Sequence, residues 1–123
     1  MDCKHKKLCP VHVDERGELW DLLNEQVGHV GLIKSKKGSV RGNHYFKKSK
    51  RNAFVLSGSF ELALALAESP DKVETKIIKE GDFVEIPPGV VHTFTALEDS
   101  TLLGMDTLSR SDEGYENDVV RIK

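Results

Sequence analysis

The chain has 123 residues, of which 38% are hydrophobic and 31% are charged, and its formal net charge is −2. This length and composition are typical of one globular domain and exclude disordered and fibrous chains. The longest apolar run, residues 62–67, is too short to cross a membrane, and residues 1–10 lack the apolar core of a signal peptide. We therefore expect a cytoplasmic protein with no membrane partner.

The basic residues are concentrated in one segment. Residues 26–60 carry eight basic side chains and no acidic one, whereas the other 88 residues carry 10 basic and 20 acidic ones, so the segment has charge +8 and the remainder −10. A local positive field attracts an anionic partner, although a solvated lysine-rich hairpin has the same composition. The eight residues are Lys34, Lys36, Lys37, Arg41, Lys47, Lys48, Lys50 and Arg51.

Two cysteines and two histidines alternate near the N-terminus, in the order Cys3, His5, Cys9, His12. Structural zinc sites usually have a longer connection between their two ligand pairs, and two cysteines cannot form a disulfide framework. We therefore expect an N-terminal strand here and not a zinc site.

The next segments in chain order are short strands separated by turns. Residues 18–26 fit either a short helix or a strand, and the segments after them fit strands. The expected strands cover residues 27–34, 52–56, 60–66, 73–79, 83–86, 90–97 and 101–105. Many short strands of this kind are typical of an all-β sandwich or barrel.

Two connections between these strands carry turn signals. Ser57-Gly58-Ser59 predicts a hairpin between the strands on either side of it. Pro87-Pro88-Gly89 predicts a turn, because proline cannot donate a hydrogen bond to a strand ladder. The strand after Gly58 alternates in polarity, which predicts one face packed on a core. The apolar residues expected on that face are every second one, Phe60, Leu62, Leu64 and Leu66.

Two histidines stand in motifs with regular glycine spacing. The first is Gly38-x5-His44, and the second is Gly81-x5-Pro87-Pro88-Gly89-x2-His92, with Gly58 between them. In this order the motifs resemble those of the cupin superfamily over about residues 28–105. The resemblance implies an all-β fold, in which residues 1–123 form a single cupin domain with a double-stranded β-helix, or jelly roll.

The resemblance to metal-binding cupins is incomplete at the ligand positions. Those proteins have His-x-His and then Glu in the first motif, and a further His in the second. Here Phe46 and Arg51 take the places of the second His and the Glu, so only His44 and His92 remain. A guanidinium adds positive charge and cannot ligate a cation. We expect neither a metal nor another cofactor.

Further segments narrow the resemblance. They are Asp14-Glu15-Arg16-Gly17, Ser39-Val40-Arg41-Gly42-Asn43-His44-Tyr45, the Pro-Gly-x-x-His element and residues 113–122. Together they resemble the dTDP-4-dehydrorhamnose 3,5-epimerase family, and Arg-Gly-Asn-His-Tyr is also similar to sugar 3,4-ketoisomerases. The resemblance implies a homodimeric, metal-independent isomerase or epimerase of a nucleotide-diphosphate sugar, in polysaccharide or deoxysugar biosynthesis.

The resemblance also implies roles for single residues. His44 matches the general base that removes a proton beside the keto group, and an imidazole titrates in the range that this needs. Arg51 takes the place of a lysine that stabilises the enolate. The residues expected to bind substrate are Arg41, Asn43, Phe46, Lys48 and His92, with the cations at the diphosphate.

Two catalytic groups of the epimerases have no clear counterpart. Residues 103–109 contain no tyrosine to act as the acid, and the carboxylate behind the base lies in a C-terminal extension of the epimerases. Asp106 or Asp118 could replace that carboxylate, and nothing in the sequence selects either. An alternative function is therefore a non-catalytic cupin that binds a sugar nucleotide or similar anion. Residues 47–51 could also contact nucleic acid, but aromatic residues are few there and the pI is near 6.2, so we expect no such partner.

Overall fold

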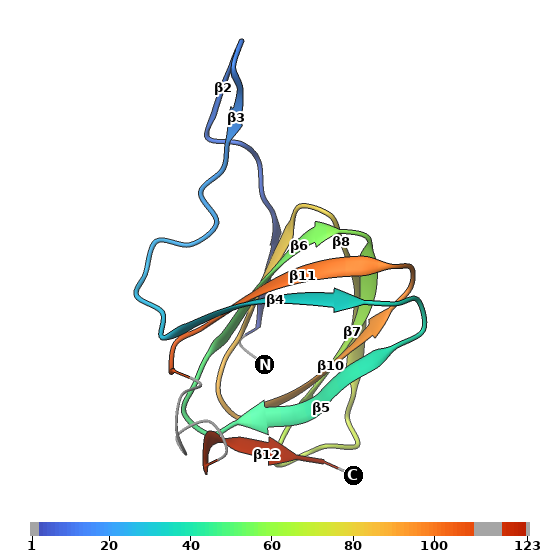
Figure 1. The fold of residues 1–123 in the computed structure, drawn as a ribbon. Helices are drawn as coiled ribbons and strands as arrows, with labels where there is room; N and C mark the ends of the chain where they lie inside the picture. Colours follow the sequence, from blue (N-terminus) through green and yellow to red (C-terminus); the bar gives the residue numbers. More distant parts are fainter. Residues whose placement is uncertain (1–2, 110–116, 123) are drawn as a thin grey trace.

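The computed structural model describes residues 3–109 and 117–122. In this part of the chain the strands form two five-stranded antiparallel sheets and a separate two-stranded hairpin, as Figure 1 shows. The strands are β1 (Lys4–Lys7), β2 (His12–Asp14), β3 (Gly17–Leu19), β4 (His29–Ser35), β5 (Val40–Phe46), β6 (Arg51–Ser57), β7 (Ser59–Leu66), β8 (Glu74–Lys79), β9 (Asp82–Ile86), β10 (Val90–Ala96), β11 (Ser100–Asp106) and β12 (Val119–Arg121). The described residues contain no helix long and apolar enough to span a bilayer.

The two large sheets are built from strands that alternate between them. The first sheet has the order β1-β9-β6-β11-β4 and the second has the order β12-β5-β10-β7-β8. From β4 to β11 each strand crosses to the opposite sheet, except that β7 and β8 are neighbours in the second sheet. This repeated crossing is the jelly-roll arrangement, so the predicted all-β fold is confirmed.

The core lies between the two sheets. The alternation predicted for β7 is confirmed, because Phe60, Leu62 and Leu64 are almost fully buried, while Leu66 is partly exposed at the strand end. Alternate residues of the facing strands complete this core, as expected when one face of each sheet is covered. Its buried members are Ala53, Val55, Phe60, Leu62, Leu64, Ile78, Val84, Ile86, Val90, Phe94, Ala96 and Leu102.

A second, smaller apolar cluster covers the outer face of the first sheet. Phe54, Phe83 and Met105 are buried there under the segment that follows β3. Trp20 from that segment packs edge-to-face on Phe54, with ring centroids 6.1 Å apart. Beyond Leu19, the segment proposed as a short helix or strand is neither, because its apolar side chains pack on the sheet from an irregular backbone.

The hairpin predicted at Gly58 is wrong. β6 pairs with β9 and β11 in the first sheet, whereas β7 pairs with β8 and β10 in the second. Gly58 has φ +83° and turns the chain from one sheet to the other. A Cβ atom at Gly58 would lie 2.1 Å from Ser100 Oγ, so this corner has no space for a side chain. A glycine with positive φ is typical of a hairpin turn, but here it allows the chain to cross from one sheet to the other.

Candidate functional site

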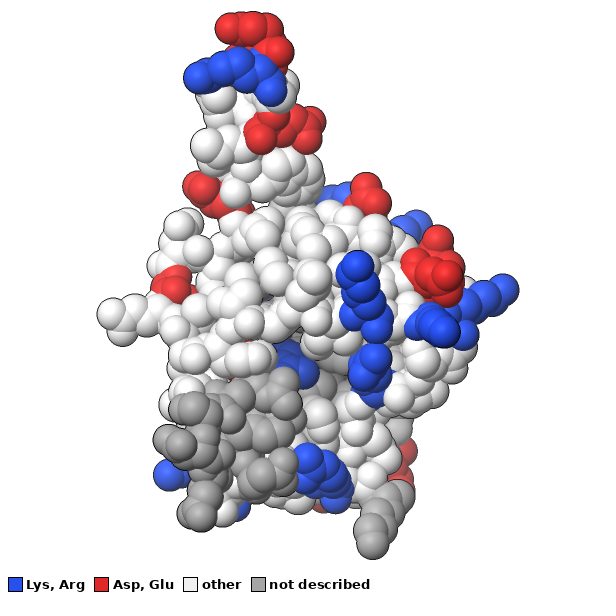
Figure 2. All heavy atoms as spheres, in the orientation of Figure 1, with Lys and Arg blue, Asp and Glu red and all other residues white. Residues whose placement is uncertain are grey.

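A cavity of about 380 Å³ opens between the two sheets. Figure 2 shows a hollow on this side of the molecule, with basic side chains in it and beside it. Strands of both sheets contribute to its wall. Its lining residues are Ile33, Ser35, Val40, Arg41, Gly42, His44, Arg51, Phe60, His92, Phe94 and Leu102.

A β-bulge in β5 brings both Arg41 and His44 to this cavity. Two residues three positions apart point to opposite faces of a regular strand. Here His92 of β10 is opposite His44 and Thr93 is opposite Gly42, so one extra residue, Asn43, lies between the two pairs. Because of that extra residue, the side chains of Arg41 and His44 point to the same face of the sheet.

The residue types in the bulge are the ones that its backbone requires. Gly42 has φ +105° and Asn43 has φ +57°, and glycine and asparagine enter this region most readily. A Cβ atom at Gly42 would also lie 2.6 Å from the His92 carbonyl oxygen. The Asn43 side chain donates to the Ile122 carbonyl oxygen at 2.6 Å, which holds the C-terminal strand beside β5.

Aromatic rings surround the two histidines. The His44 and His92 ring centroids are 4.8 Å apart, in an edge-to-face arrangement. The Phe46 ring is 5.4 Å from His44 and 5.7 Å from His92, and Phe94 packs on the other side of His92 at 6.1 Å. Such a setting excludes water and lowers the local dielectric, so each charge in it acts more strongly than it would in solvent.

His92 is held as a neutral ring. Its Nδ1 lies 3.1 Å from the Val90 carbonyl oxygen, and a carbonyl can only accept, so Nδ1 carries the proton. Burial lowers the pKa of His92 to about 3, and the positive charge of Arg51 and the proximity of His44 act in the same direction. Near neutral pH the second nitrogen, Nε2, therefore presents a lone pair.

Arg51 is the buried cation of the site. Its guanidinium donates from Nε and Nη2 to the two carboxylate oxygens of Asp106, at 2.8 and 2.9 Å. The His29 ring nitrogen Nδ1 lies 3.2 Å from the same carboxylate, and the Phe46 ring centroid is 5.0 Å from the guanidinium carbon. The bidentate pair fixes the orientation of the guanidinium, while its third nitrogen, Nη1, makes no hydrogen bond with the described residues.

Arg41 lies near the rim of the cavity and is more exposed. Its Nε donates to Ser35 Oγ at 3.0 Å, and its Nη2 donates to the Lys34 carbonyl oxygen at 3.1 Å. Both acceptors are neutral, so Arg41 keeps its full positive charge. The cavity therefore has an arginine that is ion-paired with a carboxylate inside it, Arg51, and an arginine that is bonded to neutral acceptors at its rim, Arg41.

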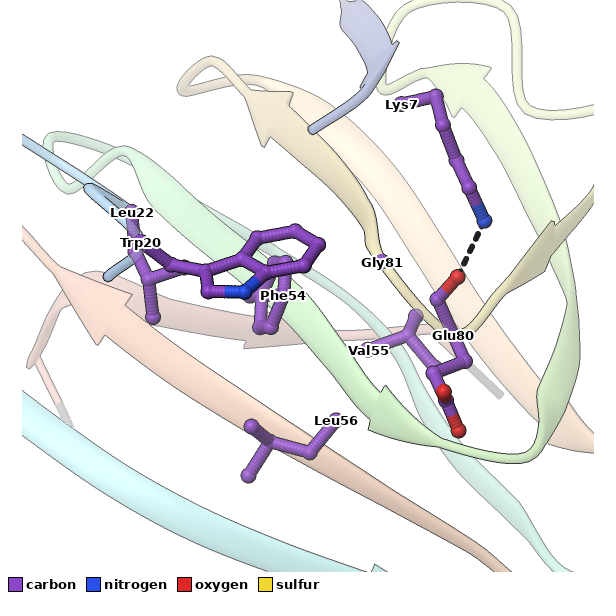
Figure 3. Close-up of a pocket in the computed structure, with 8 residues that line it drawn as sticks. All are labelled: Lys7, Trp20, Leu22, Phe54, Val55, Leu56, Glu80 and Gly81. Atoms are coloured by element: carbon purple, nitrogen blue, oxygen red, sulfur yellow. Dashed lines mark hydrogen bonds between the residues drawn. The ribbon is translucent and has the colours of Figure 1, made fainter. Parts of the chain in front are cut away.

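A larger hollow of about 530 Å³ lies outside the barrel, on the other face of β6 (Figure 3). Trp20, Leu22 and Phe54 lie together on one side of it, and Lys7, Glu80 and Gly81 lie on the other. The Lys7 ammonium donates to the Glu80 carbonyl oxygen at its edge. No histidine lines it among the described residues, so its chemistry is that of an apolar groove, and the cavity between the sheets is the stronger candidate for catalysis.

A family model described as the polysaccharide biosynthesis C-terminal domain matches residues 12–118. The chain belongs to this family. A search of curated proteins gave no match. The match covers both histidine motifs and every lining residue of the cavity.

Solved structures share the fold of this polysaccharide biosynthesis C-terminal domain. A 3,4-ketoisomerase from Thermoanaerobacterium thermosaccharolyticum, a double mutant in complex with TDP, is 24% identical with a TM-score of 0.77, over 98% of this chain and 88% of that one. A 3,4-ketoisomerase from Helicobacter canadensis is 21% identical with a TM-score of 0.81, over 99% and 92% of the two chains. A dTDP-4-dehydrorhamnose 3,5-epimerase from Sulfolobus tokodaii is 24% identical with a TM-score of 0.75, over 100% and 83%.

The structure brings some of the predicted site residues of this domain together and leaves others apart. His44, Arg51, Arg41 and His92 line the cavity, and Phe46 contacts three of them from behind. Two further residues do not belong to the described lining. Asn43 serves the bulge and the C-terminal strand, and Lys48 lies on the exposed loop after β5. The catalytic and binding roles of all these residues stay predictions.

Asp106 and Asp118, the two carboxylates that could have stood behind His44, bind other groups in the structure. Asp106 is bound to Arg51 and His29, whereas Asp118 accepts from the backbone amides of Lys48 and Ser49, at 2.7 and 3.1 Å. Tyr115 and the first part of the segment at 113–122 lie outside the described residues. No three His, Cys, Asp or Glu side chains gather among residues 3–109 and 117–122 to hold a metal, and the absence of a metal site stays a prediction.

Sequence reasoning did not find His29 or Ser35. Both lie on the same parity of β4 as Ile33, which faces the core, so correct placement of that strand would have put them on the inner face. Asp106 could have been placed on the inner face as well, because it lies at the end of β11 and occupies the same alternate positions of that strand as Leu102 and Gly104. The contact between Asp106 and Arg51 depends on the pairing of β11 with β6, which parity alone does not give.

Proposed function

We propose that this chain is an isomerase or epimerase that acts on a nucleotide-diphosphate keto sugar, with dTDP as the expected nucleotide and without a metal. The observation that carries the proposal is the convergence of His44, Arg51 and Arg41 on one cavity. The family match to a polysaccharide biosynthesis domain supports it, and so do the activities named for the solved structures of the same fold.

The proposed chemistry is a proton transfer through an enolate. His44 takes a proton from the carbon beside the carbonyl, the electron pair moves into the carbonyl, and the negative charge develops on its oxygen. Arg51 is oriented by Asp106 so that its Nη1 can donate to that oxygen. In a ketoisomerase, His44 then returns the proton to the former carbonyl carbon, while the proton of the neighbouring hydroxyl moves to the enolate oxygen. In an epimerase, the original carbon is instead protonated on its opposite face by solvent or a second acid. No redox step is needed, because atoms and electrons balance within the substrate.

The rim of the cavity suits the diphosphate. Arg41 remains charged, is held by Ser35 and Lys34, and presents a guanidinium fork that matches phosphate oxygens. The sugar would then extend inward toward His44 and Arg51. This orientation places the anion in the positive segment and the carbonyl beside the buried cation.

The proton transfer is tested by exchange with solvent. Purified protein is incubated in D2O with dTDP-4-keto-6-deoxyglucose, and incorporation of deuterium is followed by NMR. We expect His44→Ala to slow exchange at least 100-fold, the size of a general-base contribution, with an unchanged thermal midpoint. The matched control is His5→Ala on β1, whose ring contacts Asp82 at 3.3 Å and which is not among the described residues that line the cavity.

Three outcomes of this experiment separate the alternatives. Rapid exchange in the wild type and slow exchange in His44→Ala support the enzyme. Equal exchange in both proteins contradicts the role of His44. Binding of the nucleotide sugar with no exchange and no product favours the non-catalytic binding module.

We also infer that two copies of the chain associate through the β2–β3 arm. The arm projects from the sheets in Figure 1, and its Val13 and Leu19 are 63% and 55% exposed. Val30 and Leu32 are similarly exposed on β4, the edge strand of the first sheet. Apolar side chains on a projecting arm and on a sheet edge are a common basis for pairing in small β proteins.

A further inference from the structure

His92 carries a feature that the proposed proton transfer does not use. Its Nε2 is buried and makes no hydrogen bond with any described residue. The residue is 1% exposed and lines the cavity beside His44. A buried polar atom without a partner is costly and uncommon in native structures, so an explanation is required.

The tautomer of the ring defines what can bind there. Since Nδ1 donates to the Val90 carbonyl oxygen, Nε2 can only accept. The backbone bond to Val90 and the packing of Phe46 and Phe94 also hold the ring in place. A carbonyl or phosphate oxygen of a ligand would face the lone pair of Nε2 and be repelled, whereas a hydroxyl would donate to it.

The neighbouring groups prevent protonation from reversing this polarity. Burial keeps the pKa of His92 far below neutrality, and Arg51 and His44, which line the same cavity, act in the same direction. The cavity wall therefore has donors at Arg51 and an acceptor at His92. A ligand that satisfies both has an electron-rich oxygen at the first and a hydroxyl at the second.

We propose that His92 Nε2 is a fixed hydrogen-bond acceptor that selects sugars by one ring hydroxyl. This inference rests on the proposed function and goes beyond it, because it assigns a polarity to one subsite and makes His92 a specificity residue and not a proton carrier. A deoxy sugar that lacks this hydroxyl would leave the lone pair buried and unpaired. Discrimination of this type exceeds that obtained from apolar contacts alone.

The test compares the binding of dTDP, dTDP-glucose and the four monodeoxy analogues of dTDP-glucose, measured by calorimetry. We expect one analogue to bind wild-type protein on the order of tenfold or more weakly than dTDP-glucose. In His92→Phe, which keeps a ring but has no acceptor, the difference between that analogue and dTDP-glucose should disappear. His92→Gln places an amide oxygen near the Nε2 position and should retain part of the discrimination.

A second measurement needs no sugar. Long-range ¹H–¹⁵N spectra report which ring nitrogen carries the proton, and we expect His92 to keep a protonated Nδ1 and a bare Nε2 from pH 8 to pH 5. A proton on Nε2, or titration of His92 within that range, overturns the inference.

The binding panel distinguishes the failure of this inference from the failure of the proposed function. Tight binding of dTDP with no difference among the sugars, or a difference that persists in His92→Phe, overturns the role of His92 and leaves the proposed function standing. Absence of binding for dTDP and every dTDP sugar overturns the proposed function, and this inference with it.

Discussion

At the scale of single residues, the pairing of Arg51 with Asp106 determines what the buried cation can do. Both side chains are buried, at 8% and 2% exposure, and two hydrogen bonds join them. A buried pair contributes little net stability over an apolar pair, but removal of one partner leaves the other charged and unsolvated. The benefit of this pair is therefore orientation of the guanidinium, and its cost appears only when it is broken.

We predict that Asp106→Asn lowers the free energy of unfolding by about 3 kcal/mol, measured by urea denaturation. The control is Asp99→Asn, because the Asp99 carboxylate accepts only from the exposed Lys37 amide among the described residues and should lose well under half of that amount. The double variant Arg51→Met with Asp106→Leu should recover much of the stability and none of the activity. Equal losses in Asp106→Asn and Asp99→Asn would show that the buried pair is not the source of the effect.

Residue chemistry in the site was predictable where a motif identified it. The Gly-Asn step that precedes His44 identified the histidine, but the bulge that brings Arg41 to the same face depends on the register of β5 against β10. A regular strand would have put the two residues on opposite faces. The partner of Arg51 was also hidden, because Asp106 is 55 residues away along the chain.

At the scale of elements, the corner at Gly58 shows why strands were predictable and their pairing was not. Alternation of polar and apolar residues located the strands and their buried faces, since it depends only on local geometry. Glycine at a turn indicates a positive φ, which both a hairpin and a sheet crossing require. The irregular segment after β3 was missed because its apolar side chains follow the shape of the sheet beneath and have no period of their own.

The same corner allows a prediction with a close control. Gly58→Ala introduces both an unfavourable φ and a clash with Ser100, so we expect it to lower the free energy of unfolding by about 2 to 3 kcal/mol. Gly89→Ala has a similar φ, +81°, but nothing lies within 4 Å of the added Cβ atom, and about 1 kcal/mol is expected. Urea denaturation of the two variants separates strain from clash. Equal losses would mean that Ser100 moves aside without cost.

At the scale of the whole molecule, the positive segment that the sequence revealed is divided by the fold. Lys50 turns away from the cavity and pairs with Glu25 and Glu85, at 2.8 and 2.7 Å, and these carboxylates raise its pKa. Arg51 is ion-paired with Asp106, whereas Arg41, beside the cavity, donates to neutral acceptors. The excess charge of the segment is thus smaller at the site than the sequence suggests, and what remains lies where an anion would enter.

The projecting β2–β3 arm predicts that two copies of the chain associate. If the β2–β3 arm pairs with a second chain, light scattering should give a mass of twice 13.7 kDa, and Val13→Glu with Leu19→Glu should reduce it to that of one chain. A charge buried at an apolar interface is costly, whereas on a free arm it costs little, so the variant should fold as a monomer whose thermal midpoint is lowered only by the loss of the stabilisation that dimerisation gives. The control is Val73→Glu, which adds the same charge at a residue 54% exposed next to β8 and should leave the dimer intact. A monomeric wild type, or an arm variant that remains dimeric, would place the exposed apolar surface outside any interface between copies.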